Sequence, residues 1–212
     1  MPAPDGYLRP LEQSRVKTNR LEAFSDGVLA IIITIMVLEL KVPHDATLGA
    51  LARLWPVFSS YVLSFIYIGI YWNNHHHLMA AADEVSGSIL WANLHLLFWL
   101  SVLPFTTAWM GENHFGMWPT IFYGLDLLAC AVAFYLLERR IVNTQGEQGT
   151  LSRALGDDFK GKISPFLYLA GIASAWLIDP WVGMAFFVGT ALMWVVPDRR
   201  IEREVEREDK AD

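Results

Sequence analysis

The sequence predicts an all-α integral membrane protein with six transmembrane helices. Hydrophobic residues make up 54% of its 212 residues, and the mean hydropathy of +0.32 is more apolar than that of an ordinary soluble domain. Six apolar segments each approach the roughly 20 residues that cross a bilayer. The basic residues are strongly segregated between the loops that join these segments. No basic, aromatic surface of the kind that binds nucleic acid is present.

The six segments follow one another with mostly short connections. They are expected at residues 21–40, within residues 50–82, and at residues 89–110, 118–137, 163–178 and 181–196. The second segment is long for one span, and Trp55-Pro56 is expected to form an amphipathic turn at its start. Asp179-Pro180 places a proline at the start of the sixth segment, which predicts a helical hairpin. The chain then divides into a cytoplasmic N-terminal segment (residues 1–20), a transmembrane domain (residues 21–197) and a charged cytoplasmic tail (residues 198–212).

The basic residues predict the orientation of the chain, because short cytoplasmic loops carry an excess of Lys and Arg. Fourteen of them belong to one side: Arg9, Arg15, Lys17, Arg20, Arg139, Arg140, Arg153, Lys160, Lys162, Arg199, Arg200, Arg203, Arg207 and Lys210. Only two, Lys41 and Arg53, belong to the other side. Both termini are therefore expected in the cytoplasm, which requires an even number of spans. We expect the first helix to remain as a signal anchor, without a removable signal peptide.

A narrow stripe follows one side of the first predicted helix. At about 100° per residue, it consists of Gly27, Ile31, Thr34 and Leu38, with Ile35 beside it. Such a stripe faces another helix or a symmetry axis, and periodicity alone favours ordinary packing between helices. The Thr34 hydroxyl is expected to bond to its own backbone. Asp26 points roughly 130° away from the stripe, which favours a contact with a neighbouring helix.

Polar side chains gather at the cytoplasmic ends of the first three segments. An ionised carboxylate at the edge of an apolar run is costly without a partner, and Asp26 lies at such an edge. The second segment ends in a run of one Trp, two Asn and three His at residues 72–77, and the third carries Asn93 near its start. We expect interhelical hydrogen bonds to dock the three helices here. The expected network comprises Arg20, Ser25, Asp26, Trp72, Asn74, His75, His76 and Asn93.

The histidines do not have the spacing of a metal site. Three consecutive histidines, His75, His76 and His77, span about 200° of a helix, so they cannot share one ion. The spacing of four residues between histidines that a helical two-histidine site requires is absent. No catalytic triad, nucleotide-binding loop or carboxylate pair is visible, so neither an enzyme nor a cofactor is expected. His95 and His114 are isolated, which favours structural roles.

The motifs of the first three segments closely resemble those of one family, the prokaryotic relatives of transmembrane protein 175, the lysosomal potassium channel. The first motif is Arg20-x-x-x-Phe24-Ser25-Asp26, followed by a helix rich in Leu and Ile. The second and third comprise Tyr71, Trp72, Asn74, His75 and His76, and then Asn93, Leu103, Pro104, Phe105, Thr107 and Gly111. The remaining segments resemble the family in hydropathy alone. His77, where the family often has Arg, and His95 depart from its usual pattern.

The resemblance implies a homotetramer of six-helix units in which the first helix of each unit lines a central pore. It implies a pore constriction of apolar side chains at Ile31, with Leu38 further outward, and a threonine layer at Thr34. It also implies that Arg20, Ser25 and Asp26 belong to the network between helices. The expected location is the cell membrane of a prokaryote, and the expected partners are other copies of the chain, the lipid bilayer and permeant monovalent cations.

The function expected from these observations is a potassium-permeable cation channel with modest selectivity for K⁺ over Na⁺. The alternative is a proton-coupled ion transporter that uses Asp26 and the His75-His76 cluster as a relay. Its polar residues lie at one end of the bundle, whereas carriers bind their substrates near the midplane. A membrane-embedded metalloenzyme is disfavoured by the histidine spacing. No cofactor is expected besides the permeant K⁺ ions.

Overall fold

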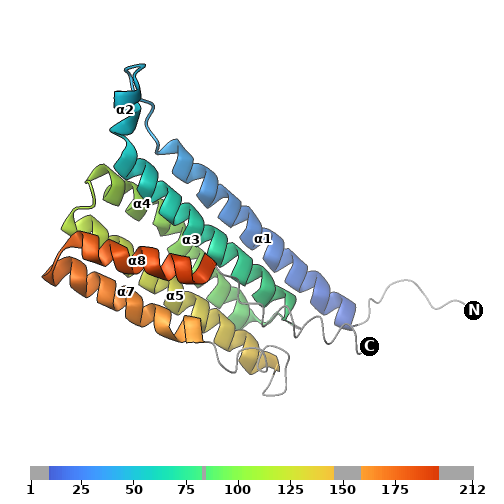
Figure 1. Cartoon of the computed structure of the whole chain (residues 1–212). Coiled ribbons are helices and arrows are strands. Elements are labelled where there is room, and N and C mark those ends of the chain that lie inside the picture. The colour runs from blue at the N-terminus through green and yellow to red at the C-terminus, as the bar shows by residue number, and fades with distance from the viewer. Residues whose placement is uncertain (1–9, 83–84, 146–158, 196–212) are drawn as a thin grey trace, which may run out of the picture.

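The computed structural model describes residues 10–82, 85–145 and 159–195, and the regular secondary structure in these ranges is entirely helical (Figure 1). The helices are α1 (Pro10–Leu38), α2 (Leu48–Ala52), α3 (Trp55–Ala80), α4 (Gly87–Glu112), α5 (Met117–Gln145), α7 (Phe159–Leu177) and α8 (Pro180–Val195). The predicted tail (residues 198–212) and residues 1–9 of the N-terminal segment lie outside the described residues.

Each of the six predicted segments coincides with one long helix, although several helices extend beyond the apolar run. The helix α1 begins eleven residues before the predicted start at residue 21, and α5 continues eight residues beyond residue 137. Polar residues can extend a membrane helix into water, so hydropathy marks the apolar part and not the ends of the helix. Among the described residues, three stretches are long and apolar enough to cross a membrane: Thr18–Leu38, Gly87–Glu112 and Met117–Thr144. Pro180–Val195 is a shorter apolar helix.

The turns follow from their local sequences. At the start of α3, Pro56 occupies the first turn, where its missing N–H costs no helical bond. The short helix α2 precedes it, capped by the Thr47 hydroxyl. Before α8, the Asp179 carboxylate accepts a hydrogen bond from the Trp181 N–H at 2.8 Å, next to Pro180. This hydrogen bond closes the α7–α8 hairpin that the sequence predicts.

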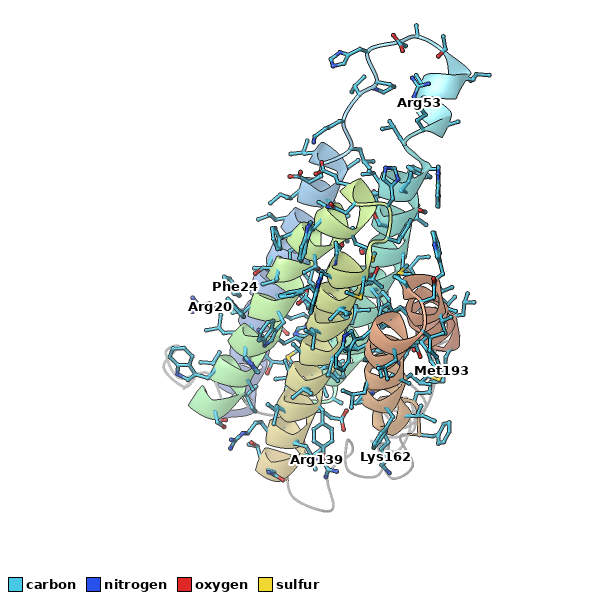
Figure 2. The ribbon with its side chains drawn as sticks, turned by 90° about the vertical axis from the view of Figure 1, so that its left-hand side faces the viewer. Arg20, Phe24, Arg53, Arg139, Lys162 and Met193 are labelled. Carbon is cyan, nitrogen blue, oxygen red and sulfur yellow. The ribbon has the colours of Figure 1, made fainter. Side chains whose placement is uncertain are left out.

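The helices form a bundle with α1 along one edge (Figure 1). The helix α1 packs on α3 and α4, while α5 packs on α4, α7 and α8. The hairpin of α7 and α8 lies across the bundle from α1 (Figure 1). Arg139 and Lys162 lie at one end of the bundle and Arg53 at the opposite end (Figure 2). The described part of the chain therefore separates its basic residues along the bundle axis as the sequence analysis expects.

The core between α5, α7 and α8 depends on close approach at glycine. A Cβ atom added to Gly124 would lie 2.4 Å from the Phe187 ring and 2.8 Å from Ile172 Cγ1. Phe187 is fully buried against the Tyr123 and Tyr168 rings. Because a packed core has little room to yield, even one added methyl group forces these aromatic side chains to move.

We predict that Gly124→Ala destabilises the bundle by about 1–3 kcal/mol through overpacking against Phe187. The matched control is Gly189→Ala on α8, where an added Cβ meets nothing within 4 Å. Alanine favours a helix over glycine by roughly 0.5–1 kcal/mol, so the control should unfold at the same temperature or higher. Thermal unfolding in detergent, followed by circular dichroism, measures both. Equal midpoints for the two variants would contradict this account of the packing.

Candidate functional site

The helix α1 has one buried face, which packs against α3 and α4. Its buried members recur every three or four residues: Thr18, Leu21, Ser25, Leu29, Ile32 and Met36. At about 100° per residue, this spacing keeps them on one side of the helix. The packing therefore sets the rotation of α1 about its own axis, and with it the direction of every other side chain on this helix.

The opposite face of α1 carries the stripe found in the sequence. Ile31 is 58% exposed, Ile35 43% and Leu38 78%, and both Gly27 and Thr34 are exposed as well. By the helical period, the centre of the stripe lies roughly half a turn from the centre of the buried face. Within the described part of the chain, the stripe therefore faces away from the helices on which α1 packs, α3 and α4. A contiguous apolar surface of this kind marks an interaction with another molecule, a pore axis or lipid.

The Thr34 hydroxyl lies in the middle of this exposed apolar stripe. It donates to backbone carbonyls of its own helix, with Oγ1 at 2.9 Å from the Ile31 oxygen and 3.1 Å from the Ala30 oxygen. A hydroxyl that donates backwards in this way leaves its oxygen lone pairs facing outward. The stripe thus offers an oxygen ligand between the apolar side chains of Ile31 and Leu38.

A buried chain of hydrogen bonds joins α1, α4 and α3, and we call it the Ser25–Asn93–His75 chain. The Ser25 hydroxyl donates to the Leu21 carbonyl at 2.9 Å, so its oxygen accepts from Asn93 Nδ2, also at 2.9 Å. The Asn93 Oδ1 atom lies 2.8 Å from His75 Nε2. Because an amide oxygen only accepts, His75 donates from Nε2. All three side chains are at least 99% buried.

A second pair of contacts joins α1 to α3 nearer the surface. Trp72 Nε1 donates to Asp26 Oδ1 at 3.0 Å, and His76 Nδ1 lies 2.6 Å from Glu22 Oε1. The two acceptors are four residues apart on α1, and the two ring nitrogens are four apart on α3 in the opposite order. Antiparallel helices bring such pairs together one turn at a time. These contacts therefore fix the register of α1 against α3.

Two members of the expected network lie apart from these contacts. Arg20 is exposed and makes no hydrogen bond or ion pair with the described part of the chain; it points away from the bundle with Phe24 (Figure 2). Asn74 Nδ2 donates to the Ile70 carbonyl of its own helix at 2.8 Å. The other six members, Ser25, Asp26, Trp72, His75, His76 and Asn93, all make contacts between helices.

Glu22 is a contact residue that the sequence analysis missed. A carboxylate at the start of a membrane helix is typical of a solvated end, so composition alone did not single it out. The signal was positional, since Glu22 precedes Asp26 by one helical turn as Trp72 precedes His76. His95, by contrast, accepts from Trp99 Nε1 on its own helix at 3.0 Å, in agreement with a structural role.

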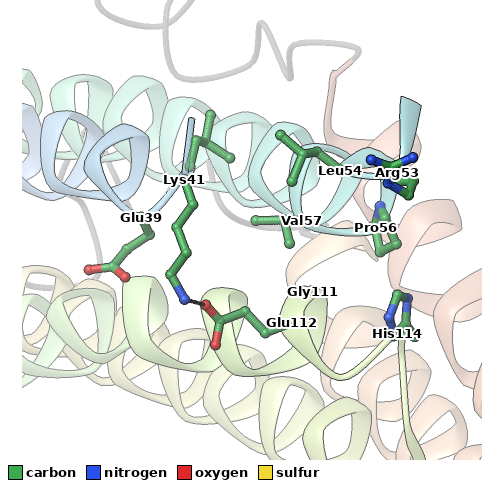
Figure 3. Close-up of a pocket in the computed structure, with 10 residues that line it drawn as sticks. Glu39, Lys41, Arg53, Leu54, Pro56, Val57, Gly111, Glu112 and His114 are labelled. Carbon is green, nitrogen blue, oxygen red and sulfur yellow. Dashed lines mark hydrogen bonds and ion pairs between the residues drawn. The ribbon is translucent and has the colours of Figure 1, made fainter. Parts of the chain in front are cut away.

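The C-terminal end of α1 borders a cavity of about 380 Å³, which is also lined by the connection from α2 to α3, the start of α3 and the end of α4 (Figure 3). Charged and polar side chains line it: Glu39, Lys41, Arg53, Glu112 and His114. The Lys41 ammonium lies 2.5 Å from the Glu112 carboxylate, which raises the pKa of this lysine. Both side chains are well exposed, so the pair adds little stability. Among the described residues, no group of three His, Cys, Asp or Glu side chains is arranged to hold a metal ion.

Comparison with known proteins identifies the family. The family model described as the endosomal/lysosomal potassium channel TMEM175 matches residues 20–104, which contain the exposed stripe and the Ser25–Asn93–His75 chain. A potassium channel from Chryseobacterium sp. (strain P1-3) is 51% identical over 186 residues, covering 88% of this chain and 96% of the relative. This chain belongs to the TMEM175 family. The family and the apolar helices together make it a membrane protein.

Two further comparisons agree with this membership. A potassium channel from Streptomyces collinus is 35% identical over 136 residues, covering 60% of this chain and 66% of the relative. The crystal structure of a lysosomal potassium-selective channel TMEM175 homologue from Chamaesiphon minutus superposes with a TM-score of 0.74 at 28% identity. That match covers 85% of this chain and 97% of the solved one. The described helices therefore adopt the fold of the TMEM175 channels.

We predict that Asn93→Leu destabilises the protein, because it leaves the buried His75 Nε2 without an acceptor and the Ser25 oxygen without its donor. Each unsatisfied buried group costs about 1–3 kcal/mol. The control is Ser101→Ala on the same helix, whose exposed hydroxyl bonds only to the Phe98 carbonyl. The midpoint of thermal unfolding in detergent should fall for Asn93→Leu and stay near wild type for the control. An unchanged midpoint in Asn93→Leu would show that the chain of hydrogen bonds does not hold α1.

Proposed function

We propose that the protein is a potassium-permeable cation channel in which α1 lines the pore. The names of the TMEM175 relatives support this function. The observation that carries the assignment to α1 is the exposed stripe, which lies opposite the face that packs on α3 and α4. A helix held on one side by its own subunit and apolar on the other is suited to line an axis shared with other subunits.

The proposed constriction is formed by Ile31, with Leu38 further outward and Ile35 beside them. A narrow ring of branched apolar side chains excludes water and stops ions, and it passes them when it widens enough to stay wet. Thr34 lies between the two levels and offers a hydroxyl oxygen from each subunit. We propose that these oxygens replace part of the ion's hydration shell and favour K⁺ modestly over Na⁺.

The proposed assembly is a homotetramer in a prokaryotic cell membrane. Four copies of the stripe would surround the axis and remove it from lipid. We further propose that all six long helices cross the bilayer between residues 21 and 197, with both termini in the cytoplasm. The separation of Arg139 and Lys162 from Arg53 along the bundle supports this orientation.

The contacts of Asp26 and His76 favour a channel over a proton-coupled transporter. A relay residue in a carrier faces a cavity or a substrate near the midplane. Asp26 instead accepts from Trp72, and His76 lies against Glu22 at the same end of α1. These side chains join α1 to α3, which suits a positioning role.

We predict that Ile31→Asn increases K⁺ flux into proteoliposomes, because a polar amide keeps the constriction hydrated. Lowering the barrier by about 1.4 kcal/mol raises the rate about tenfold. The matched control is Val37→Asn, a similar change at an exposed position of α1 that lies off the stripe. The control should conduct at the wild-type rate. Equal flux in wild type and Ile31→Asn, with both proteins folded, would contradict the proposed constriction.

A further inference from the structure

A carboxylic acid lies in the core of the bundle, far from the face proposed to line the pore. Asp126 belongs to α5 and is only 4% exposed. It occurs within Met117–Thr144, one of the stretches apolar enough to cross a membrane. An ionisable side chain in such a place is costly unless it is paired, hydrated or neutral. The contacts of Asp126 distinguish between these states.

No cation compensates Asp126 within the part of the chain that the structure describes. It forms none of the ion pairs found there. The titratable groups that face it are neutral hydroxyl and thiol groups: Tyr123 and Cys130 on α5 itself, and Tyr71 on α3.

The other helices packed against α5 supply no charge to Asp126 either. On α4, His95 bonds to Trp99 and Glu112 pairs with Lys41. On α7, Tyr168 lies against the Tyr67 ring and Lys160 lies over the Trp194 ring, while Lys162 lies at the end of the bundle with Arg139 (Figure 2). Between Pro180 and Val195, α8 has no ionisable side chain. Asp126 is therefore a buried acid without a counter-charge among these residues.

The contacts of Thr106 Oγ1 have one hydroxyl hydrogen for two acceptors. Thr106 Oγ1 lies 2.9 Å from Asp126 Oδ2 and 3.1 Å from the Leu103 carbonyl oxygen. A carbonyl and an ionised carboxylate can only accept, and the threonine hydroxyl has a single hydrogen to donate. One hydrogen can serve both contacts only as a shared, three-centre bond. A proton on Asp126 Oδ2 supplies the second hydrogen, because the acid then donates to Thr106 while Thr106 donates to Leu103.

A neighbouring set of hydroxyl groups has no such deficit. Tyr123 Oη lies 3.0 Å from Ser64 Oγ, which lies 2.7 Å from Thr107 Oγ1, and Thr107 donates to the Leu103 carbonyl at 2.6 Å. Three hydroxyl hydrogens serve these three contacts in one direction, from Tyr123 through Ser64 to Thr107. The proton deficit is therefore specific to the contact between Asp126 and Thr106.

We propose that Asp126 is a proton-binding site in the core of each subunit, and that its protonated carboxyl group joins α5 to α4 through Thr106. The ligand is a proton and not a metal ion, because Thr106 is the only hydrogen-bond partner of this carboxyl group among the described residues, and a metal ion requires several oxygen ligands. With Oδ2 protonated, Oδ1 becomes a carbonyl oxygen, which can remain without a partner at lower cost than a carboxylate oxygen. Oδ1 has no partner among the described residues. The inference does not depend on the proposed channel function.

Infrared spectroscopy of the purified wild-type protein, reconstituted in lipid at neutral pH, tests this site directly. We expect a C=O stretching band of a protonated carboxyl group that shifts when the aspartates carry ¹³C in their side-chain carboxyl groups. The band should lie at the high-frequency end of the carboxylic acid range, since Oδ1 accepts no hydrogen bond. It should be absent from Asp126→Asn, whose amide nitrogen can still donate to Thr106 Oγ1.

The control is Glu138→Gln, which removes the other carboxyl group that is buried on α5 and should leave the aspartate band unchanged. Thr106→Val removes the acceptor of the acid proton and should shift the band without abolishing it, which assigns the band even if Asp126→Asn does not fold. Carboxylate bands alone from the labelled wild-type aspartates would overturn the proposal. A band that persists in a folded Asp126→Asn protein, or that Thr106→Val leaves in place, would overturn it as well.

Discussion

The rotation of α1 depends on one side chain amide, that of Asn93. Its nitrogen donates to Ser25 on α1 and its oxygen accepts from His75 on α3, so a single residue of α4 positions both neighbouring helices. A buried polar group without a partner is costly in a membrane protein, and turning α1 would break the bond between Ser25 and Asn93. The helical period then converts this constraint on one face of α1 into a fixed direction for the opposite face.

The two faces of α1 make different contacts, which explains how polar and apolar residues can share one helix. Ser25 and Asp26 lie at the level where the contacts to α3 and α4 are made. The apolar side chains of the stripe begin at Ile31, just over one turn later, and they are exposed in the described part of the chain. In the proposed channel, the first set holds the helix and the second meets the ions. A change in the hydrogen bonds would then act on the pore by turning or tilting α1.

Much of this arrangement was predictable from sequence, because hydropathy and charge identify membrane helices and their ends. Ser25, His75 and Asn93 were expected to meet since each lies at the same end of its segment. Arg20 was expected with them and is exposed instead, because one turn before Phe24 the helix points it away from α3 and α4. Asp126 was not among the residues expected to matter from the sequence. Its proposed role depends on the contact with Thr106 on another helix, which is visible only in the folded structure.

Cysteine accessibility in a Cys130→Ala background tests most directly whether the exposed face of α1 lines the pore. Thr34→Cys places a thiol on the stripe. Ile33→Cys places one at the preceding residue, whose side chain packs against the core. A cationic methanethiosulfonate reagent added to proteoliposomes should block K⁺ flux through Thr34→Cys and leave Ile33→Cys conducting. Block at both positions, or flux that survives confirmed modification of Thr34→Cys, would contradict the account.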